Sequence, residues 1–213
     1  MNLIDMPITT FLQEVDAPTA IPGGGSVSAL GIAMGIGLLG MVGQLTMAKK
    51  KFLQLEEPVK QAFSNQIKEL ACLKKEALEL VDRDSMAYNV IMDAYRLPKE
   101  TEEQIKYRKQ VIDEATIQAT IVPLLSAKKA YFAIKLALPL FPLIVKSAGS
   151  DFGVGIMMLE AGLVGAVLNV RTNMAGFSDP LIASNYLNQA KKLEEDGRAM
   201  AKQALDMVND LWK

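Results

Sequence analysis

The chain has 213 residues, of which 50% are hydrophobic and 6% aromatic, and its formal net charge is -1. This length is enough for one well-buried core, and the near-neutral charge gives no sign of binding to nucleic acid or to an acidic membrane surface. Histidine is absent, which excludes Ser-His and Cys-His catalytic pairs and most zinc sites.

Proton transfer would therefore have to come from Asp, Glu, Lys, Tyr or the single cysteine, Cys72, with a pKa shifted by its surroundings. One cysteine cannot form an internal disulfide, which fits the reducing cytosol. The sequence begins without the basic segment of a secretory signal. We therefore expect a cytoplasmic protein.

The first half of the chain predicts three helices. A short amphipathic helix covers residues 4–15, and residues 18–25 form a loop. Ser26 is the expected N-cap of a helix that ends near residue 48, and residues 17–48 carry no charge. This segment is long enough to cross a bilayer, but its many small residues favour a buried core helix in a protein of amphipathic helices. A helix from Pro58 to about Tyr95 follows, with apolar residues at intervals of three and four.

The second half predicts further helices. Thr101 begins a capping box with Gln104, and Pro123 should kink or break the helix that follows. Residues 130–145 form a broken apolar helix, Asp151 caps another that runs to Asn173, and residues 178–180 start the last one. No strand alternation, repeat or linker is visible. We expect an all-α, single-domain bundle over residues 1–213, with a long central helix and buried helices rich in small residues.

Two segments could carry chemistry at helix starts and inside a helix. Gly23, Gly24 and Gly25 leave backbone N–H groups open to a ligand, although a flexible turn explains them equally well. Asp82 and Asp84 lie two residues apart and therefore point to opposite sides of their helix. Asp84 shares the face of the apolar residues, where burial would raise its pKa, but a partnered surface carboxylate is the alternative.

Two other groups are polar or basic. Asn169 and Asn173 share one otherwise apolar helical face, so we expect them to bond each other, a neighbouring helix or a ligand. Lys49, Lys50 and Lys51 follow the uncharged helix, where they would stabilise its C-terminus or bind an acidic substrate tail.

Taken together, these segments resemble the cyclodeaminase domain of the formiminotransferase-cyclodeaminase family. The resemblance is carried in the family's order by PGGGSVSA at 22–29, LTMAKKKF at 45–52, VDRDSMAYN at 81–89, YRLPK at 95–99, Ser150-Asp151, Val154-Gly155 and GAVLNV at 165–170 with Asn173. Ala48 stands where many relatives carry glycine. The resemblance covers nearly the whole chain.

The resemblance implies a homodimeric enzyme that converts 5-formimidoyl-tetrahydrofolate to 5,10-methenyl-tetrahydrofolate and ammonia. It places the catalytic acid–base group on Asp84. We expect Gly24, Gly25, Ser26 and Asp151 to line the folate cleft, with Asn169 and Asn173 nearby. Lys49, Lys50 and Lys51 are expected at the glutamyl carboxylates or a polyglutamate tail. No metal and no cofactor is expected, since tetrahydrofolate enters as the substrate that carries the carbon.

Three alternatives remain open at this stage. Hydrolysis of methenyl- to 10-formyl-tetrahydrofolate uses the same substrate ring, and the residues do not separate it from the cyclodeaminase reaction. A non-catalytic folate-binding dimer would keep the same cleft. A small membrane protein could be built on the uncharged segments.

Overall fold

The computed structural model describes residues 2–213, and no strand occurs among them. The helices are α1 (Ile8–Asp16), α2 (Gly24–Met47), α3 (Lys50–Leu53), α4 (Glu57–Tyr95), α5 (Glu102–Ala137), α6 (Gly149–Met174) and α7 (Pro180–Asp210). Three short 3-10 helices are η1 (Leu3–Asp5), η2 (Leu138–Leu143) and η3 (Lys146–Ala148). The prediction of an all-α fold is confirmed.

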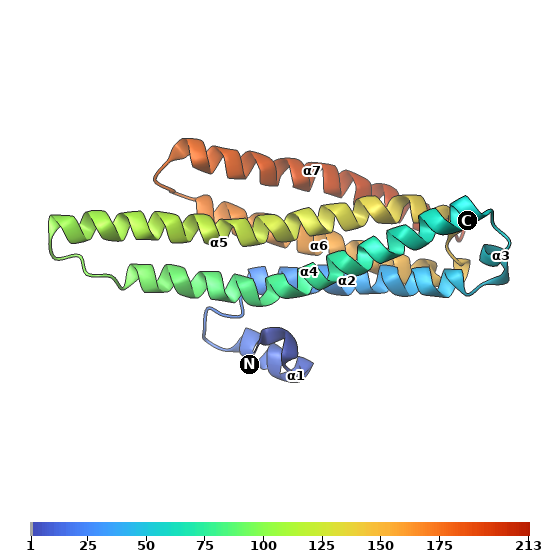
Figure 1. The fold of residues 1–213 in the computed structure, drawn as a ribbon, viewed down its shortest axis with the longest axis horizontal. Coiled ribbons are helices and arrows are strands. Elements are labelled where there is room, and N and C mark those ends of the chain that lie inside the picture. The colour runs from blue at the N-terminus through green and yellow to red at the C-terminus, as the bar shows by residue number, and fades with distance from the viewer. Residues whose placement is uncertain (1) are drawn as a thin grey trace.

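The long helices lie roughly along one axis (Figure 1). α4 and α5 form an antiparallel hairpin, α2 and α6 pack behind it, and α7 lies along α5 and α6. α1 stands off the bundle beside the middle of α4. α2 and α6 run antiparallel, because Gly24 lies opposite Asn169 at one end while Gly35 lies opposite Gly155 farther along.

Several predicted helix boundaries are confirmed by their capping contacts. Thr101 accepts a hydrogen bond from the Gln104 N–H and completes the capping box at the start of α5. Asp179 caps α7 by accepting bonds from the N–H groups of Leu181 and Ile182. Pro58 lies in the first turn of α4, where its missing N–H leaves no hydrogen bond unmade.

Other expectations at helix starts are wrong. The N-cap of α2 is Gly23, so Ser26 lies inside the helix, and α6 begins at Gly149 with Asp151 in its first turn rather than at the cap. The segment expected as one helix over 4–15 divides into η1 and α1. Pro7 separates them, because the residue before a proline is driven out of the helical region.

Of the two expected outcomes at Pro123, a kink or a break, the break is wrong, since α5 continues from Glu102 to Ala137. A proline cannot donate to the carbonyl four residues earlier, which here belongs to Ala119. That carbonyl accepts a hydrogen bond of 3.0 Å from Asn173 Nδ2 of α6 instead. The neighbouring helix therefore replaces the bond that the proline removes.

The helices rich in small residues pack closely, as expected. A Cβ at Gly35 would lie 2.7 Å from the Gly155 carbonyl, and one at Gly162 would lie 2.9 Å from the Ser28 carbonyl. Larger residues would force α2 and α6 apart. α2 and the segment Lys146–Met174 are long and apolar enough to cross a membrane, but half of each apolar window is buried inside the fold.

Candidate active site

Asp82 and Asp84 of α4 point to opposite sides of the helix, as their spacing predicts. The carboxylate of Asp82 accepts a hydrogen bond from the Leu3 N–H of η1. Asp84 is half-buried and follows Leu80 and Val81, which are buried in the core. Only Asp84 therefore turns toward the interior of the bundle.

Ser26 lies directly behind Asp84. Its side chain is fully buried, and its hydroxyl lies 3.0 Å from Asp84 Oδ2, 2.9 Å from the Val81 carbonyl and 3.1 Å from the Ser85 hydroxyl. A hydroxyl donates one hydrogen bond and accepts others, so Ser26 donates to either the carboxylate or the carbonyl at any moment. Ser26 thus contacts the acid and not the open cavity.

Burial raises the pKa of the Asp84 carboxyl above its usual range, because the charged form loses hydration. The side-chain and backbone hydrogen bonds from Ser26 stabilise the carboxylate and lower the pKa, but they only partly oppose burial. Asp84 is therefore an acid whose proton is held more tightly than that of a surface aspartate.

A cavity of about 190 Å³ opens in front of Asp84. It is lined by Ala20, Ile21, Gly23, Gly24, Gly25, Asp84, Tyr88, Ile91, Ala119, Asn169, Thr172 and Asn173. Gly25 makes room for the acid, since a Cβ at that position would lie within about 2.5 Å of the Asp84 carboxyl carbon. The N-terminus of α2 can therefore approach the carboxyl group only with glycine at 25.

The two asparagines occupy the α6 wall of this cavity. Asn169 donates to the Gly165 carbonyl at 2.9 Å, and Asn173 donates to the Ala119 carbonyl that Pro123 leaves free. Each amide is thereby held in one orientation. Thr172, which the sequence analysis did not single out, lies between them in the same wall.

Tyr88 and Ile91 also line the cavity but were not predicted as site residues. The signal that could have identified them is helical spacing, because they follow Asp84 by four and seven residues on the same face of α4.

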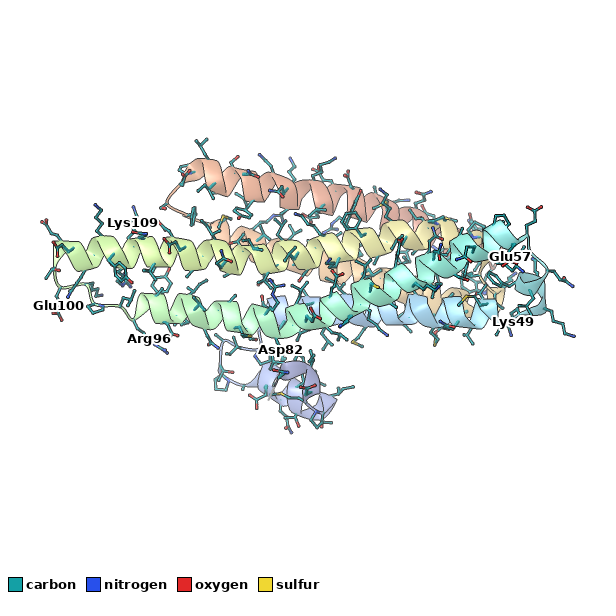
Figure 2. All side chains as sticks on the ribbon, viewed as in Figure 1. Lys49, Glu57, Asp82, Arg96, Glu100 and Lys109 are labelled. Atoms are coloured by element: carbon teal, nitrogen blue, oxygen red, sulfur yellow. The ribbon has the colours of Figure 1, made fainter. Side chains whose placement is uncertain are left out.

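The remaining predicted residues lie elsewhere in this chain. Lys49, Lys50 and Lys51 follow the C-terminal end of α2, and Figure 2 shows Lys49 far from Asp82, which neighbours Asp84. α2 separates Gly24 from these lysines by roughly 36 Å at 1.5 Å per residue. Asp151 lies in the first turn of α6, at the same end as the lysines and roughly 27 Å along that helix from Asn169.

The lysines surround a second cavity of about 590 Å³. Lys146 joins them, and the rest of the lining is largely apolar, with Phe52, Leu55 and residues 142–145. None of the four lysines forms an ion pair within the described part of the chain. In one copy of the chain, the predicted site residues thus form two separate groups. Within residues 2–213, no three acidic or Cys side chains cluster closely enough to hold a metal ion.

Comparison with known proteins extends over nearly all of the chain. The family model described as formiminotransferase-cyclodeaminase matches residues 7–192. The chain is 33% identical to a methenyltetrahydrofolate cyclohydrolase of Methylorubrum extorquens, over 94% of this chain and 95% of the relative. It is 31% identical to the formimidoyltransferase-cyclodeaminase of Sus scrofa, over 97% of this chain but only 38% of that protein.

The fold has a close counterpart among solved structures. The formiminotetrahydrofolate cyclodeaminase of Thermotoga maritima superposes with a TM-score of 0.85 over 98% of both chains, at 20% identity. This structural likeness shows the fold, whereas the sequence matches show the family. The chain belongs to the formiminotransferase-cyclodeaminase family.

Proposed function

We propose that this chain is an enzyme of one-carbon folate chemistry that acts on the carbon bound to N5 of tetrahydrofolate. The first reaction is conversion of 5-formimidoyl-tetrahydrofolate to 5,10-methenyl-tetrahydrofolate and ammonia. The observation that carries the proposal is the half-buried Asp84, whose raised pKa suits proton transfer and whose carboxyl faces a cavity cleared by Gly25.

In the cyclodeaminase reaction, N10 attacks the formimidoyl carbon and forms a tetrahedral species with three nitrogens on one carbon. N10 must then lose a proton, and the departing nitrogen must gain one before ammonia leaves. The Asp84 carboxylate takes the first proton and returns it to the leaving nitrogen. A single acid suffices because both nitrogens are bound to the same carbon.

Ser26 adapts to both protonation states of Asp84. When Asp84 is charged, the hydroxyl donates to it, and when Asp84 is protonated, the hydroxyl accepts and donates instead to the Val81 carbonyl. Ser26 is thus a positioning residue rather than a substrate ligand, because it is fully buried.

The second candidate reaction is hydrolysis of 5,10-methenyl- to 10-formyl-tetrahydrofolate. It is favoured by one finding: the relative of matching length, at 33% identity, is named methenyltetrahydrofolate cyclohydrolase. Here the Asp84 carboxylate attracts the cationic ring carbon and takes a proton from the attacking water. The transferase activity named for the bifunctional relatives is not proposed, since this chain spans only 38% of the Sus scrofa protein.

The proposal also covers the domain, the location and the oligomeric state of the enzyme. We place the activity in one cytoplasmic domain over residues 1–213, acting as a homodimer without a metal or a resident cofactor. The Asp84 cavity holds the reacting ring, with Gly24, Asn169 and Asn173 as its binding walls.

Two parallel absorbance assays on purified protein test the proposal. One follows the appearance of methenyl-tetrahydrofolate from 5-formimidoyl-tetrahydrofolate together with released ammonia, and the other follows its loss to 10-formyl-tetrahydrofolate. Catalysed formation identifies a cyclodeaminase, and catalysed loss alone identifies a cyclohydrolase. Rates equal to the spontaneous ones in both assays would contradict the proposed enzyme activity. A non-catalytic folate-binding protein would then remain as the alternative.

A further inference from the structure

We propose that Pro123 is a positioning residue of the Asp84 cavity. It leaves the Ala119 carbonyl without a donor inside α5, and the Asn173 amide of α6 is held in the cavity wall by bonding that carbonyl. The part of Pro123 in holding Asn173 follows from the packing of α5 against α6. Its effect on turnover rests on the proposed function.

The position of Pro123 is unfavourable for its own helix. Pro123 is buried and is the only proline inside an α-helix of the described residues. Pro58 and Pro180 lie in the first turns of α4 and α7, and Pro139 and Pro142 lie in the 3-10 helix η2. A proline in a helix interior removes one hydrogen bond, and its ring clashes with the carbonyl four residues earlier. The reason for Pro123 therefore lies outside α5.

Other carbonyl groups of α5 receive an extra bond from the same helix. The hydroxyl groups of Thr116, Thr120 and Ser126 donate to the carbonyls four residues earlier, at 2.7 Å, 2.7 Å and 3.3 Å. A serine or threonine at position 123 could bond the Ala119 carbonyl in the same way. Proline has neither an N–H nor a hydroxyl group, so the Ala119 carbonyl depends on a donor from another helix.

The Asn173 side chain is that donor. Its Nδ2 lies 3.0 Å from the Ala119 oxygen, and both residues line the Asp84 cavity. An N–H at position 123 would compete with Asn173 for this oxygen and draw the carbonyl toward the axis of α5. Within residues 2–213, the Asn173 side chain makes no other hydrogen bond. The bond to Ala119 is therefore what fixes the orientation of this amide.

Asn173 differs in this respect from the other polar residues of the α6 wall. Asn169 and Thr172 donate to carbonyls of α6 itself, at 2.9 Å and 3.0 Å. Their orientation does not depend on α5. A change at Pro123 should consequently release Asn173 and leave the other two side chains in place.

The residue before the proline contacts the helix that carries Asp84. Val122 is buried in one cluster with Leu80 and Val81, which precede Asp84 by about one turn of α4. α5 is thus fixed to α4 one residue before the proline and to α6 four residues before it. This segment of α5 links the wall that holds Asp84 to the wall that holds Asn173.

A fixed amide matters because the acid and the reacting carbon must meet in one geometry. An Asn173 side chain without its bond to Ala119 can rotate, and the substrate ring can then bind in several orientations relative to Asp84. A displacement of about 1 Å can lower a rate by about 10²-fold. Partial misalignment of the ring should therefore lower kcat/KM by about tenfold.

Amide resonances test the bond without any need for turnover. In protein labelled with ¹⁵N-asparagine, the side-chain signals of residues 169 and 173 are assigned by their loss in Asn169→Ala and Asn173→Ala. We expect Pro123→Ala to move the Asn173 signals upfield, because a hydrogen bond is lost, and to leave those of Asn169 in place. Unmoved Asn173 signals, or equal movement of both, would overturn the proposal even if the proposed reaction is right.

Turnover of the same variant tests the effect on the site. Pro123→Ala should keep its helical circular dichroism and lose about tenfold in kcat/KM. Pro123→Ser supplies two competing donors, an N–H and a hydroxyl, and should lose at least as much. Ser126→Ala is the matched control, since it removes a buried hydroxyl from α5 without affecting Ala119 and should keep kcat/KM. Unchanged kcat/KM in a folded Pro123→Ala variant would refute the positioning role.

A double-mutant cycle separates positioning from packing. Pro123→Ala should lower kcat/KM about tenfold in the wild type but less than about twofold in Asn173→Ala, because its target is then already missing. In Asn169→Ala the full loss should remain, since Asn169 is bonded within α6. Equal losses in all three backgrounds would mean that Pro123 acts through the packing of α5, contrary to the proposal. A wild type inactive in both folate assays would refute the proposed function, while the amide resonances still decide whether Pro123 holds Asn173.

Discussion

The two ends of α2 differ in the charge, the burial and the cavity size of their surroundings. At the Gly24 end, a half-buried acid with a raised pKa faces a small cavity that no basic side chain lines. At the Met47 end, a cavity about three times as large is surrounded by four exposed lysines and an apolar floor. The first end suits proton transfer, and the second suits the binding of anions.

The contrast shows how one chain can separate reactivity from charge recognition. Burial raises the pKa of Asp84 only while water and cations stay away, because a nearby lysine would stabilise the carboxylate and lower that pKa. Exposed lysines, by contrast, can follow a mobile anionic tail. The following predictions test this division, beginning with the largest expected effect.

Loss of the Asp84 carboxyl group should lower kcat more than any other change. Asp84→Asn keeps the size of the side chain but cannot take up or return a proton, so kcat should fall by about 10²–10⁴-fold. Circular dichroism and the sedimentation coefficient should stay unchanged. Near-normal turnover in a folded variant would remove Asp84 from the mechanism. Another group would then have to carry out the proton transfer.

A methyl group beside the acid should be the next most damaging change. Gly25→Ala places a Cβ against the Asp84 carboxyl and must displace it, which should lower kcat at least tenfold. Gly40→Ala is the matched control in the same helix, since its Cβ would meet nothing within 4 Å. Equal turnover in both variants would show that the close approach of α2 to Asp84 is unimportant.

Neutralising the other end should affect binding rather than chemistry. Lys49→Gln, Lys50→Gln, Lys51→Gln should raise KM about tenfold for substrates with several glutamyl carboxylates, equivalent to about 1.4 kcal/mol of lost interaction. kcat should change little, and the difference should shrink at high salt. The same three substitutions at Lys191, Lys192 and Lys202 of α7 change the net charge equally and should leave KM unaltered.

Removing the Ser26 hydroxyl should shift the pH dependence of kcat/KM. Ser26→Ala deletes a hydrogen bond that stabilises the Asp84 carboxylate, so its pKa should rise further and the acidic limb of kcat/KM should move to higher pH. The loss of kcat/KM should therefore be larger on the acidic limb than on the plateau at higher pH. Ser85→Ala leaves the Ser26–Asp84 bond intact and should not move the limb.

The smallest effect concerns stability. Because the pKa of Asp84 is raised on folding, the native state binds its proton more tightly than the unfolded chain. Stability is therefore lost as pH rises from the usual range of aspartate through the raised pKa. Asp84→Asn should unfold at a slightly higher temperature than the wild type at pH 7, and the advantage should shrink at low pH. A less stable variant at pH 7 would contradict the desolvation of Asp84.

Some of these features could be predicted from individual residues. The helices begin at Thr101 and Asp179 because those side chains bond N–H groups within the same turn, a relation that sequence alone contains. The opposite directions of Asp82 and Asp84 likewise follow from the angle between residues in a helix. The family resemblance through the glycine turn and the Asp84 segment agrees with the relationship that the comparisons established.

Other features depended on contacts between distant segments. Ser26 is the cap that the sequence predicts, but its hydroxyl bonds the Val81 carbonyl of α4, and the N-cap of α2 is Gly23. Pro123 does not break α5, because Asn173 of α6 bonds the carbonyl that proline leaves free. Neither contact could be read from local spacing, since each partner lies more than 50 residues away.

By itself, the sequence indicated the all-α fold, the opposite directions of Asp82 and Asp84 and the family, because these depend on short-range periodicity and on the order of motifs. The tertiary structure alone decided which residues meet. Antiparallel packing of α2 and α6 joins Gly24 to Asn169 and leaves the lysines and Asp151 at the other end, because two straight helices can bring together only residues at the same height.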